Sequence, residues 1–226
     1  SIKYNNLALV VVDEQHRFGV EQRYSLIKKA THNGIVPHQL IMTATPIPRT
    51  LAMTAYGDLD NSIISELPSG RGEITTLCLS EDKRADVVKK ALREIEKGRQ
   101  VYWVCPLIEE SEEHNRESAE ATYKKLSKEL EGHRIGLVHG KLSVDKKNKA
   151  MSDFKKHDLD LLVATTVIEV GVDVPNASMM IIENTERLGL SQLHQLRGRV
   201  GRGEHESFCV MLYKNPLGET AKQRLE

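Results

Sequence analysis

Short apolar runs alternate with amphipathic segments along residues 74–212, and this alternation constrains the fold more than any other feature of the chain. Six runs have the length and composition of buried strands: residues 74–79, 101–105, 135–139, 159–165, 179–182 and 208–212. Runs that are apolar at nearly every position are typical of strands covered on both faces. Strands separated by helices form parallel sheets. We therefore predict an α/β domain with a parallel sheet and helices on both of its faces.

The segments between these runs predict helices from their caps and their apolar spacing. Ser80 and Ser143 are suitable N-cap residues, because a serine hydroxyl accepts a hydrogen bond from an N–H group of the first turn. The helix after Ser143 is expected to bury Val144, Met151 and Phe154. Two further helices are predicted over residues 119–130 and 191–200.

The first 67 residues are organised differently. They contain two convincing strands, residues 7–12 and 39–42, with a helix around residues 21–29 between them. Two strands make too small a sheet to be stable alone, and the chain has no Gly-x-x-x-x-Gly-Lys-Ser/Thr phosphate loop. We therefore expect the chain to begin inside a first domain. The predicted organisation is the end of that domain (1–67), a linker (68–73), a complete second domain (74–215) and the start of a following segment (216–226).

The composition of the chain gives no sign of an overall basic protein, of a metal site built from cysteines or of a membrane span. The 32 basic and 32 acidic side chains cancel, so binding to nucleic acid must depend on local patches. The candidates are Arg197, Arg199 and Arg202, and a lysine group for which a solvated helix face is an equally good interpretation: Lys141, Lys146, Lys147, Lys149, Lys155 and Lys156. The three cysteines lack metal-ligand spacing and are expected to be reduced. We find neither a membrane span nor a signal peptide, and we expect a cytoplasmic protein.

The most informative motif is Gln-Leu-Arg-Gly-Arg-Val-Gly-Arg, at residues 195–202. Arg199 and Arg202 are three positions apart, so on a helix they would point the same way. Gly198 and Gly201 keep bulk away from the neighbouring surface. Two guanidinium groups presented together suit a phosphate whose negative charge grows during transfer. For an isolated pair, a solvated basic helix face would be the alternative.

A second motif, far upstream, supports the phosphate interpretation. The apolar run Val10-Val11-Val12 ends in two adjacent carboxylates, Asp13 and Glu14. Nucleotide-hydrolysing folds use such a pair to hold Mg²⁺ and to activate a water molecule. Together the two motifs predict an ATP-driven motor that uses ATP and Mg²⁺.

These motifs, taken with three others, resemble those of superfamily 2 helicases. Asp13-Glu14-Gln15-His16 is similar to the DExH box, and Thr43-Ala44-Thr45-Pro46 is similar to motif III. Motifs IV, V and VI are matched in order by Val138-His139-Gly140, by Ala164-Thr165-Thr166 through Gly171-Val172-Asp173, and by residues 195–202.

The sequence around the motifs is more specific. Residues 18–20, 46–51, 105–111 and 183–190 resemble the RecG family of branched-DNA translocases, and the resemblance covers nearly the whole chain apart from residues 112–120. It implies a RecA-like fold for the parallel sheet, preceded by the incomplete end of a first RecA-like lobe. The transcription-repair coupling factor shares much of the Pro-Ile-Pro-Arg-Thr stretch, but the Arg-Gly-Arg-Val-Gly-Arg-Gly stretch followed by Phe208-Cys209-Val210 fits RecG better.

The resemblance also implies roles for residues of the first lobe. Asp13 would hold Mg²⁺ through its water shell, and Glu14 would polarise the attacking water. Gln15 and His16 would bind at the nucleotide and sense the other lobe. The residues that would couple the nucleotide state to the partner lobe are Thr43, Ala44 and Thr45.

In the second lobe, the resemblance implies that Arg199 and Arg202 reach the γ-phosphate. Gln195 would contact the nucleotide or the region of Glu14, and Gly171 would allow close backbone approach. Asp173 would either bind the ribose or orient the arginines. The residues expected at the DNA backbone are His139, Gly140, Lys141, Thr165 and Thr166.

By this resemblance we expect part of an ATP-dependent helicase that remodels stalled forks and Holliday junctions in DNA repair and recombination. The expected partners are branched double-stranded DNA and the single-stranded-DNA-binding protein, in the bacterial cytoplasm at the nucleoid and not at a membrane. The chain alone is expected to be inactive, because the phosphate loop is missing. The alternatives are a transcription-repair coupling translocase and a nucleic-acid-binding module that does not hydrolyse ATP.

Overall fold

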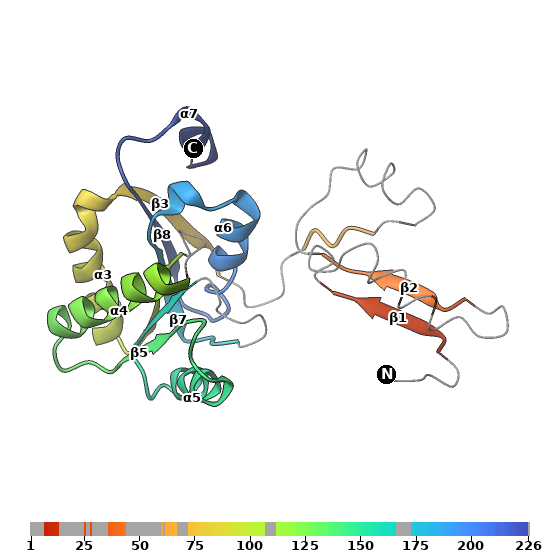
Figure 1. Ribbon diagram of the computed structural model, residues 1–226, viewed down its shortest axis with the longest axis horizontal. Helices are drawn as coiled ribbons and strands as arrows, with labels where there is room; N and C mark the ends of the chain where they lie inside the picture. Colours follow the sequence, from red (N-terminus) through yellow and green to blue (C-terminus); the bar gives the residue numbers. More distant parts are fainter. Residues whose placement is uncertain are drawn as a thin grey trace. The chain divides into compact units, whose positions relative to one another are not determined.

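The computed structural model describes residues 7–13, 36–43, 62–66, 72–106, 112–165 and 173–225, together with Ser25, Lys28 and Asp60. The chain forms two compact units, Ser1–Ile64 and Ser65–Glu226 (Figure 1).

The first unit contains the two predicted strands, β1 (Leu9–Val12) and β2 (His38–Ile41). They are parallel, and Val12 is opposite Ile41. Side chains alternate along β1, so that Val10 and Val12 are buried with Leu7 packed against them. Of the helix expected around residues 21–29, the structure describes Ser25 and Lys28, and both have helical backbone.

The second unit is built on a six-stranded sheet in the order β3-β8-β7-β4-β6-β5, and every pairing is parallel. All six strands predicted from the sequence are confirmed: β3 (Ile74–Ser80), β4 (Gln100–Cys105), β5 (Ile135–Val138), β6 (Leu161–Thr165), β7 (Ala177–Ile182) and β8 (Ser207–Tyr213). The three central strands β4, β6 and β7 are buried at every position, which explains why their sequences are apolar without alternation.

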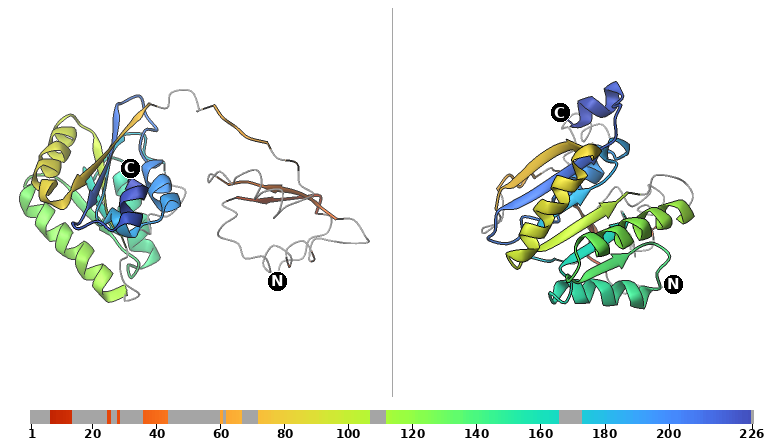
Figure 2. Two further views of the ribbon diagram at one scale, coloured as in Figure 1. Left: turned by 90° about the horizontal axis from the view of Figure 1, so that it is seen from above. Right: turned by 90° about the vertical axis from the view of Figure 1, so that its left-hand side faces the viewer.

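Helices cover both faces of this sheet, as predicted (Figure 2). The described α-helices of this unit are α3 (Arg84–Glu96), α4 (Glu112–Glu129), α5 (Val144–Lys155), α6 (Leu190–Arg197) and α7 (Glu219–Leu225). Two short 3₁₀ helices accompany them, η2 (Glu81–Lys83) and η3 (Thr185–Arg187). On one face, α3 and α4 pack around Trp103; on the other, α5 and α6 pack around Tyr102. The two aromatic residues are neighbours on β4 and therefore point to opposite faces.

The predicted caps are present. The hydroxyl of Ser143 accepts from the backbone N–H of Lys146 at 3.4 Å and begins α5, whereas Ser80 caps η2, one turn before α3 starts. The prediction that α5 buries Val144 is wrong, because this residue is 69% exposed. Val144 is the first residue of the helix, and the core residues that hold Met151 and Phe154 do not cover that first turn.

A partly buried network joins the ends of two central strands to α3. The carboxylate of Glu183, just after β7, accepts from Trp103 Nε1 at 2.9 Å and from Arg84 Nε at 3.3 Å. The guanidinium of Arg84 also lies 4.9 Å from the centre of the Trp103 ring and donates to Glu129 at 3.3 Å. Burial, and secondarily the charge of Glu183, raises the pKa of the Cys105 thiol well above its usual range. The network therefore fixes the carboxyl ends of β4 and β7 relative to one another.

Candidate functional site

The candidate residues of the second unit follow the carboxyl ends of the strands. Because all six strands are parallel, these ends lie along one edge of the sheet. Val138 pairs with Ala164, which places His139 beside Thr165 at that edge. Asp173 lies in the connection from β6 to β7, and the arginine motif lies in the connection from β7 to β8.

Arg199 and Arg202 do not lie on a helix, which corrects the expectation drawn from their spacing. The helix α6 ends at Arg197, three residues earlier than predicted, and Gly198 is its C-cap. Arg199 and Arg202 occupy the turn that follows, residues 198–203, which we call the arginine turn. The shape of this turn, and not helical periodicity, therefore orients these two side chains.

Two glycines explain the shape of the arginine turn. Gly201 has a φ of +74°, a left-handed conformation that favours glycine. A Cβ atom on Gly201 would lie 2.7 Å from Cγ1 of Ile74, and one on Gly203 would lie 2.4 Å from the carbonyl oxygen of Pro175. No side chain fits at either position without displacing its neighbours, so both glycines are required for the turn to pack as it does.

The arginine turn places the guanidinium group of Arg202 close to Asp173. Arg202 Nη1 lies 3.3 Å from Asp173 Oδ1, and Arg202 Nε donates to the carbonyl of Gly198 at 3.1 Å. Burial raises the pKa of the Tyr102 hydroxyl to about 12, and the nearby positive charges of Arg199 and Arg202 act against that rise. Arg202 and Asp173 are both substantially exposed, with side-chain fractions of 36% and 55%, so this pair is accessible to a ligand.

Arg197 points elsewhere and contacts β3. Its Nε donates to Thr76 Oγ1 at 3.0 Å, and its Nη2 donates to the carbonyl of Ile74 at 3.4 Å. Gln195, on α6, is half-buried. Neither the β3 contacts of Arg197 nor the position of Tyr102 behind the arginine turn gave any signal in the sequence. The requirement for Gly203 could have been suspected, because the motif places glycine on both sides of Arg202.

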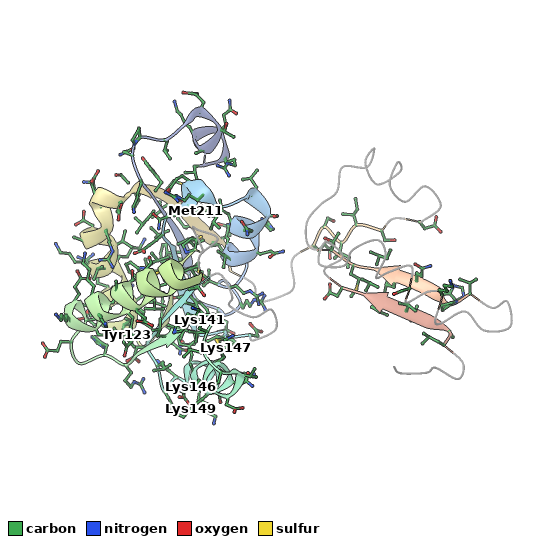
Figure 3. All side chains as sticks on the ribbon, viewed as in Figure 1. Tyr123, Lys141, Lys146, Lys147, Lys149 and Met211 are labelled. Carbon is green, nitrogen blue, oxygen red and sulfur yellow. The ribbon has the colours of Figure 1, made fainter. Side chains whose placement is uncertain are left out.

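The residues expected at DNA differ in exposure. Gly140 and Lys141 are exposed in the turn between β5 and α5. His139 is buried, with Nε2 3.9 Å from Glu120 Oε1, and Thr165 is buried with a hydroxyl that has no hydrogen-bond partner in the part of the chain that the structure describes. Figure 3 shows Lys141 in the turn before α5 and three more lysines along that helix: Lys146, Lys147 and Lys149. Lys141, Lys146 and Lys149 are exposed and Lys147 is half-buried, so basic side chains continue from the end of β5 onto α5.

In the first unit, two expected site residues follow neighbouring parallel strands. Asp13 comes directly after β1, Thr43 comes shortly after β2, and both are exposed. The carboxylate of Asp13 fits a magnesium ion, because Mg²⁺ binds few protein carboxylates and takes its remaining ligands from water and phosphate. The other residues expected at the nucleotide, in coupling or at DNA lie outside the described residues: Glu14, Gln15, His16, Ala44, Thr45, Thr166 and Gly171.

Two classes of feature are missing from the described residues. None of their helices is long and apolar enough to span a membrane. Nor do those residues contain a group of three or more histidine, cysteine or acidic side chains that could hold a metal ion.

Comparison with known proteins links this geometry to helicases. Residues 83–204 match the family described as the helicase conserved C-terminal domain. Over all 226 residues the chain is 60% identical to the ATP-dependent DNA helicase RecG of Haemophilus influenzae and 59% identical to that of Escherichia coli strain K12. The chain spans about a third (33%) of the length of these curated relatives.

Solved structures show the same fold. A structure of RecG bound to a three-way DNA junction is 44% identical, with a TM-score of 0.76, and the match covers 100% of this chain and 28% of that one. Saccharomyces cerevisiae Dbp5 bound to RNA and ADP BeF3 is 17% identical, with a TM-score of 0.63 over 96% of this chain and 56% of that one. These likenesses confirm the predicted α/β, RecA-like parallel sheet.

Proposed function

The chain belongs to the family of the helicase conserved C-terminal domain, and on this premise we propose that it is part of an ATP-dependent DNA helicase of the RecG type that acts on branched DNA. The arginine turn carries this proposal, since it holds both Arg199 and Arg202, and Arg202 pairs with the exposed Asp173 that follows another strand of the same parallel sheet. The relatives that match the whole chain are named as ATP-dependent DNA helicases, and one related structure is bound to a three-way junction.

Within this function we assign Arg199 and Arg202 to the γ-phosphate of ATP. Guanidinium groups stabilise the charge that develops there as the phosphoryl group is transferred. Asp173 orients Arg202, which is supported by the 3.3 Å contact between them. Gln195 and Gly171 are assigned to the nucleotide.

We assign the binding of Mg²⁺, the activation of the attacking water and the coupling of the nucleotide state to the residues that follow β1 and β2. Asp13 would hold Mg²⁺ through water, which neutralises phosphate charge, and Glu14 would polarise the attacking water. Gln15 and His16 would bind the nucleotide. Thr43, Ala44 and Thr45 would transmit the nucleotide state, and the exposure of Asp13 and Thr43 after parallel strands supports these roles.

DNA would bind through its phosphate backbone at the edge formed by β5 and β6. Gly140 and Lys141 are exposed there, and Lys141 carries a positive charge that suits a phosphate. The side chains of His139 and Thr165 are buried, and we propose that these residues contribute to the DNA site through their backbone groups. Thr166 is assigned to the DNA phosphates as well. In the cell this activity would remodel stalled forks and Holliday junctions during repair and recombination, with single-stranded-DNA-binding protein as a further partner at the bacterial nucleoid.

The test is ATP hydrolysis and strand separation by the full-length protein with three matched substrates: a three-way junction, a linear duplex and a single strand. We expect the junction to be unwound with ATP and Mg²⁺, and Asp13→Asn to abolish both hydrolysis and unwinding because the Mg²⁺ ligand is lost. Thr75→Val, an exposed substitution on β3, is the matched control and should behave as wild type.

Three outcomes would contradict the proposal. Hydrolysis without any unwinding of the junction would argue against the helicase. Unwinding of linear duplex and junction at the same rate would argue against branch specificity. Displacement of a stalled RNA polymerase, without action on free junctions, would instead identify a transcription-repair coupling translocase.

A further inference from the structure

The arginine turn needs support from outside itself. Among the described residues its backbone N–H groups donate three hydrogen bonds back to α6, from Gly198 N to His194 O at 3.0 Å, from Arg199 N to Leu196 O at 3.0 Å and from Val200 N to Arg197 O at 3.4 Å. Val200 is buried and anchors the middle of the turn. A short turn with a left-handed glycine at its fourth residue would otherwise sample several conformations.

That support comes from β3, one of the two outermost strands of the sheet. Arg197 ties the last turn of α6 to β3 through Thr76 Oγ1 and Ile74 O, at 3.0 and 3.4 Å. After Arg199 the arginine turn approaches β3 again, where Gly201 packs directly against the side chain of Ile74. The strand therefore touches the chain both before and after Arg199.

The guanidinium group of Arg197 is used in these contacts. Both of its described donors point to β3 and not to Asp173, which is the partner of Arg202. Arg197 therefore differs from Arg199 and Arg202 in function, although all three belong to one motif.

We propose that Arg197 is a positioning residue, which uses Thr76 and Ile74 of β3 to fix the arginine turn and hence the place of Arg199 and Arg202. This inference rests on the proposed function, in which those two arginines meet the γ-phosphate. A group that stabilises charge in a transition state must be placed accurately, and a displacement of about 1 Å can cost ~10²-fold in rate. Loss of the β3 contacts should thus lower turnover and leave the binding of ATP nearly unchanged.

The test compares four variants of the full-length protein: Arg197→Ala, Thr76→Val, the double variant and Thr75→Val. Thr76→Val removes the acceptor hydroxyl and keeps the branched shape, while Thr75→Val makes the same change at the preceding residue of β3, which is exposed like Thr76 and points to the opposite face of the sheet. We expect Arg197→Ala to lower kcat for DNA-dependent ATP hydrolysis by about 10- to 100-fold with KM for ATP unchanged. Thr76→Val should cause a smaller loss, and the double variant should be no worse than Arg197→Ala, because both changes remove the same contact.

Two readouts separate positioning from general damage. The melting temperature shows whether each variant is folded, and hydrogen exchange should increase at residues 198–203 in Arg197→Ala and Thr76→Val but not in Thr75→Val. Normal kcat in Arg197→Ala, or additive losses in the double variant, would overturn the inference. Arg199→Ala measured alongside tests the proposed function separately: if it retains full turnover, the role of the arginine turn is wrong, whereas an inactive Arg199→Ala beside a normal Arg197→Ala refutes only the positioning role.

Discussion

Replacement of Glu183 by alanine removes the central acceptor of the network that joins β4, β7 and α3. Trp103 Nε1 then loses its acceptor at 2.9 Å, and Arg84 loses the more buried of its two carboxylate partners. The side chains of Arg84 and Glu183 are 13% and 16% exposed, so water replaces the lost bonds poorly. An unsatisfied buried donor costs about 1–3 kcal/mol, and a hydrogen bond to a charged group contributes about 1.5–3 kcal/mol.

The expected loss in the free energy of unfolding is therefore about 3–4 kcal/mol, since Arg84 retains Glu129 as a partner. For a chain of this size that corresponds to a melting temperature lower by about 6–16 °C. Trp103 is the chain's single tryptophan, so its fluorescence during urea unfolding reports on the second unit alone.

The matched control is Glu129→Ala, which removes the outer partner of the same arginine. The side chain of Glu129 is 35% exposed, and the expected cost is about 0–1 kcal/mol. If both alanine variants unfold at the same urea concentration, the Glu183 network does not stabilise the carboxyl ends of the strands as we infer.

Three further predictions follow from the chain and its charges. The 226-residue chain alone should hydrolyse ATP at background rate even with excess junction DNA, because it has no phosphate loop; a DNA-stimulated phosphate release would contradict this. Its DNA binding should be weak and steeply dependent on salt, and Lys141→Ala should reduce the slope of log K against log salt by about 1, which a fluorescence-anisotropy titration measures. Burial by itself would raise the pKa of Asp160, but hydrogen bonds from the side chain and backbone of Arg134 outweigh it and lower that pKa. Asp160 therefore stabilises the fold above the ordinary aspartate pKa of about 3.9, so Asp160→Asn should melt below wild type at pH 7, and the difference should shrink as the pH falls below about 4.

The sheet of the second unit could be predicted because its signals are local. Each of the strands β4, β6 and β7 is mostly apolar and buried at every position, and Ser143 begins its helix with a hydrogen bond to its own first turn. The alternation of the two patterns then specifies a parallel sheet without any knowledge of distant contacts.

The arginine turn could not be predicted in this way, because distant residues determine it. The spacing of Arg199 and Arg202 is compatible with a helix. However, Ile74 and Pro175, which are distant in sequence, leave no space for a side chain at Gly201 and Gly203. The prediction for Val144 was wrong for a related reason: its apolar character fits the inner face of α5, but the core cluster of the described residues does not include the first turn of that helix.

The central claim is that Arg199 and Arg202 stabilise the transferring γ-phosphate. It is tested most directly by kcat for ATP hydrolysis of the full-length protein, at saturating ATP and junction DNA, in Arg199→Ala and Arg202→Ala. An arginine that meets developing charge contributes on the order of 10³–10⁵ in rate, roughly 4–7 kcal/mol, whereas an arginine in a surface ion pair contributes about 0–1 kcal/mol to stability and nothing to turnover. Arg187→Ala, which removes an exposed arginine of η3, is the control and should retain full activity. We predict a loss of at least ~10³-fold in both variants with the melting temperature preserved; near-normal turnover in both would contradict the account.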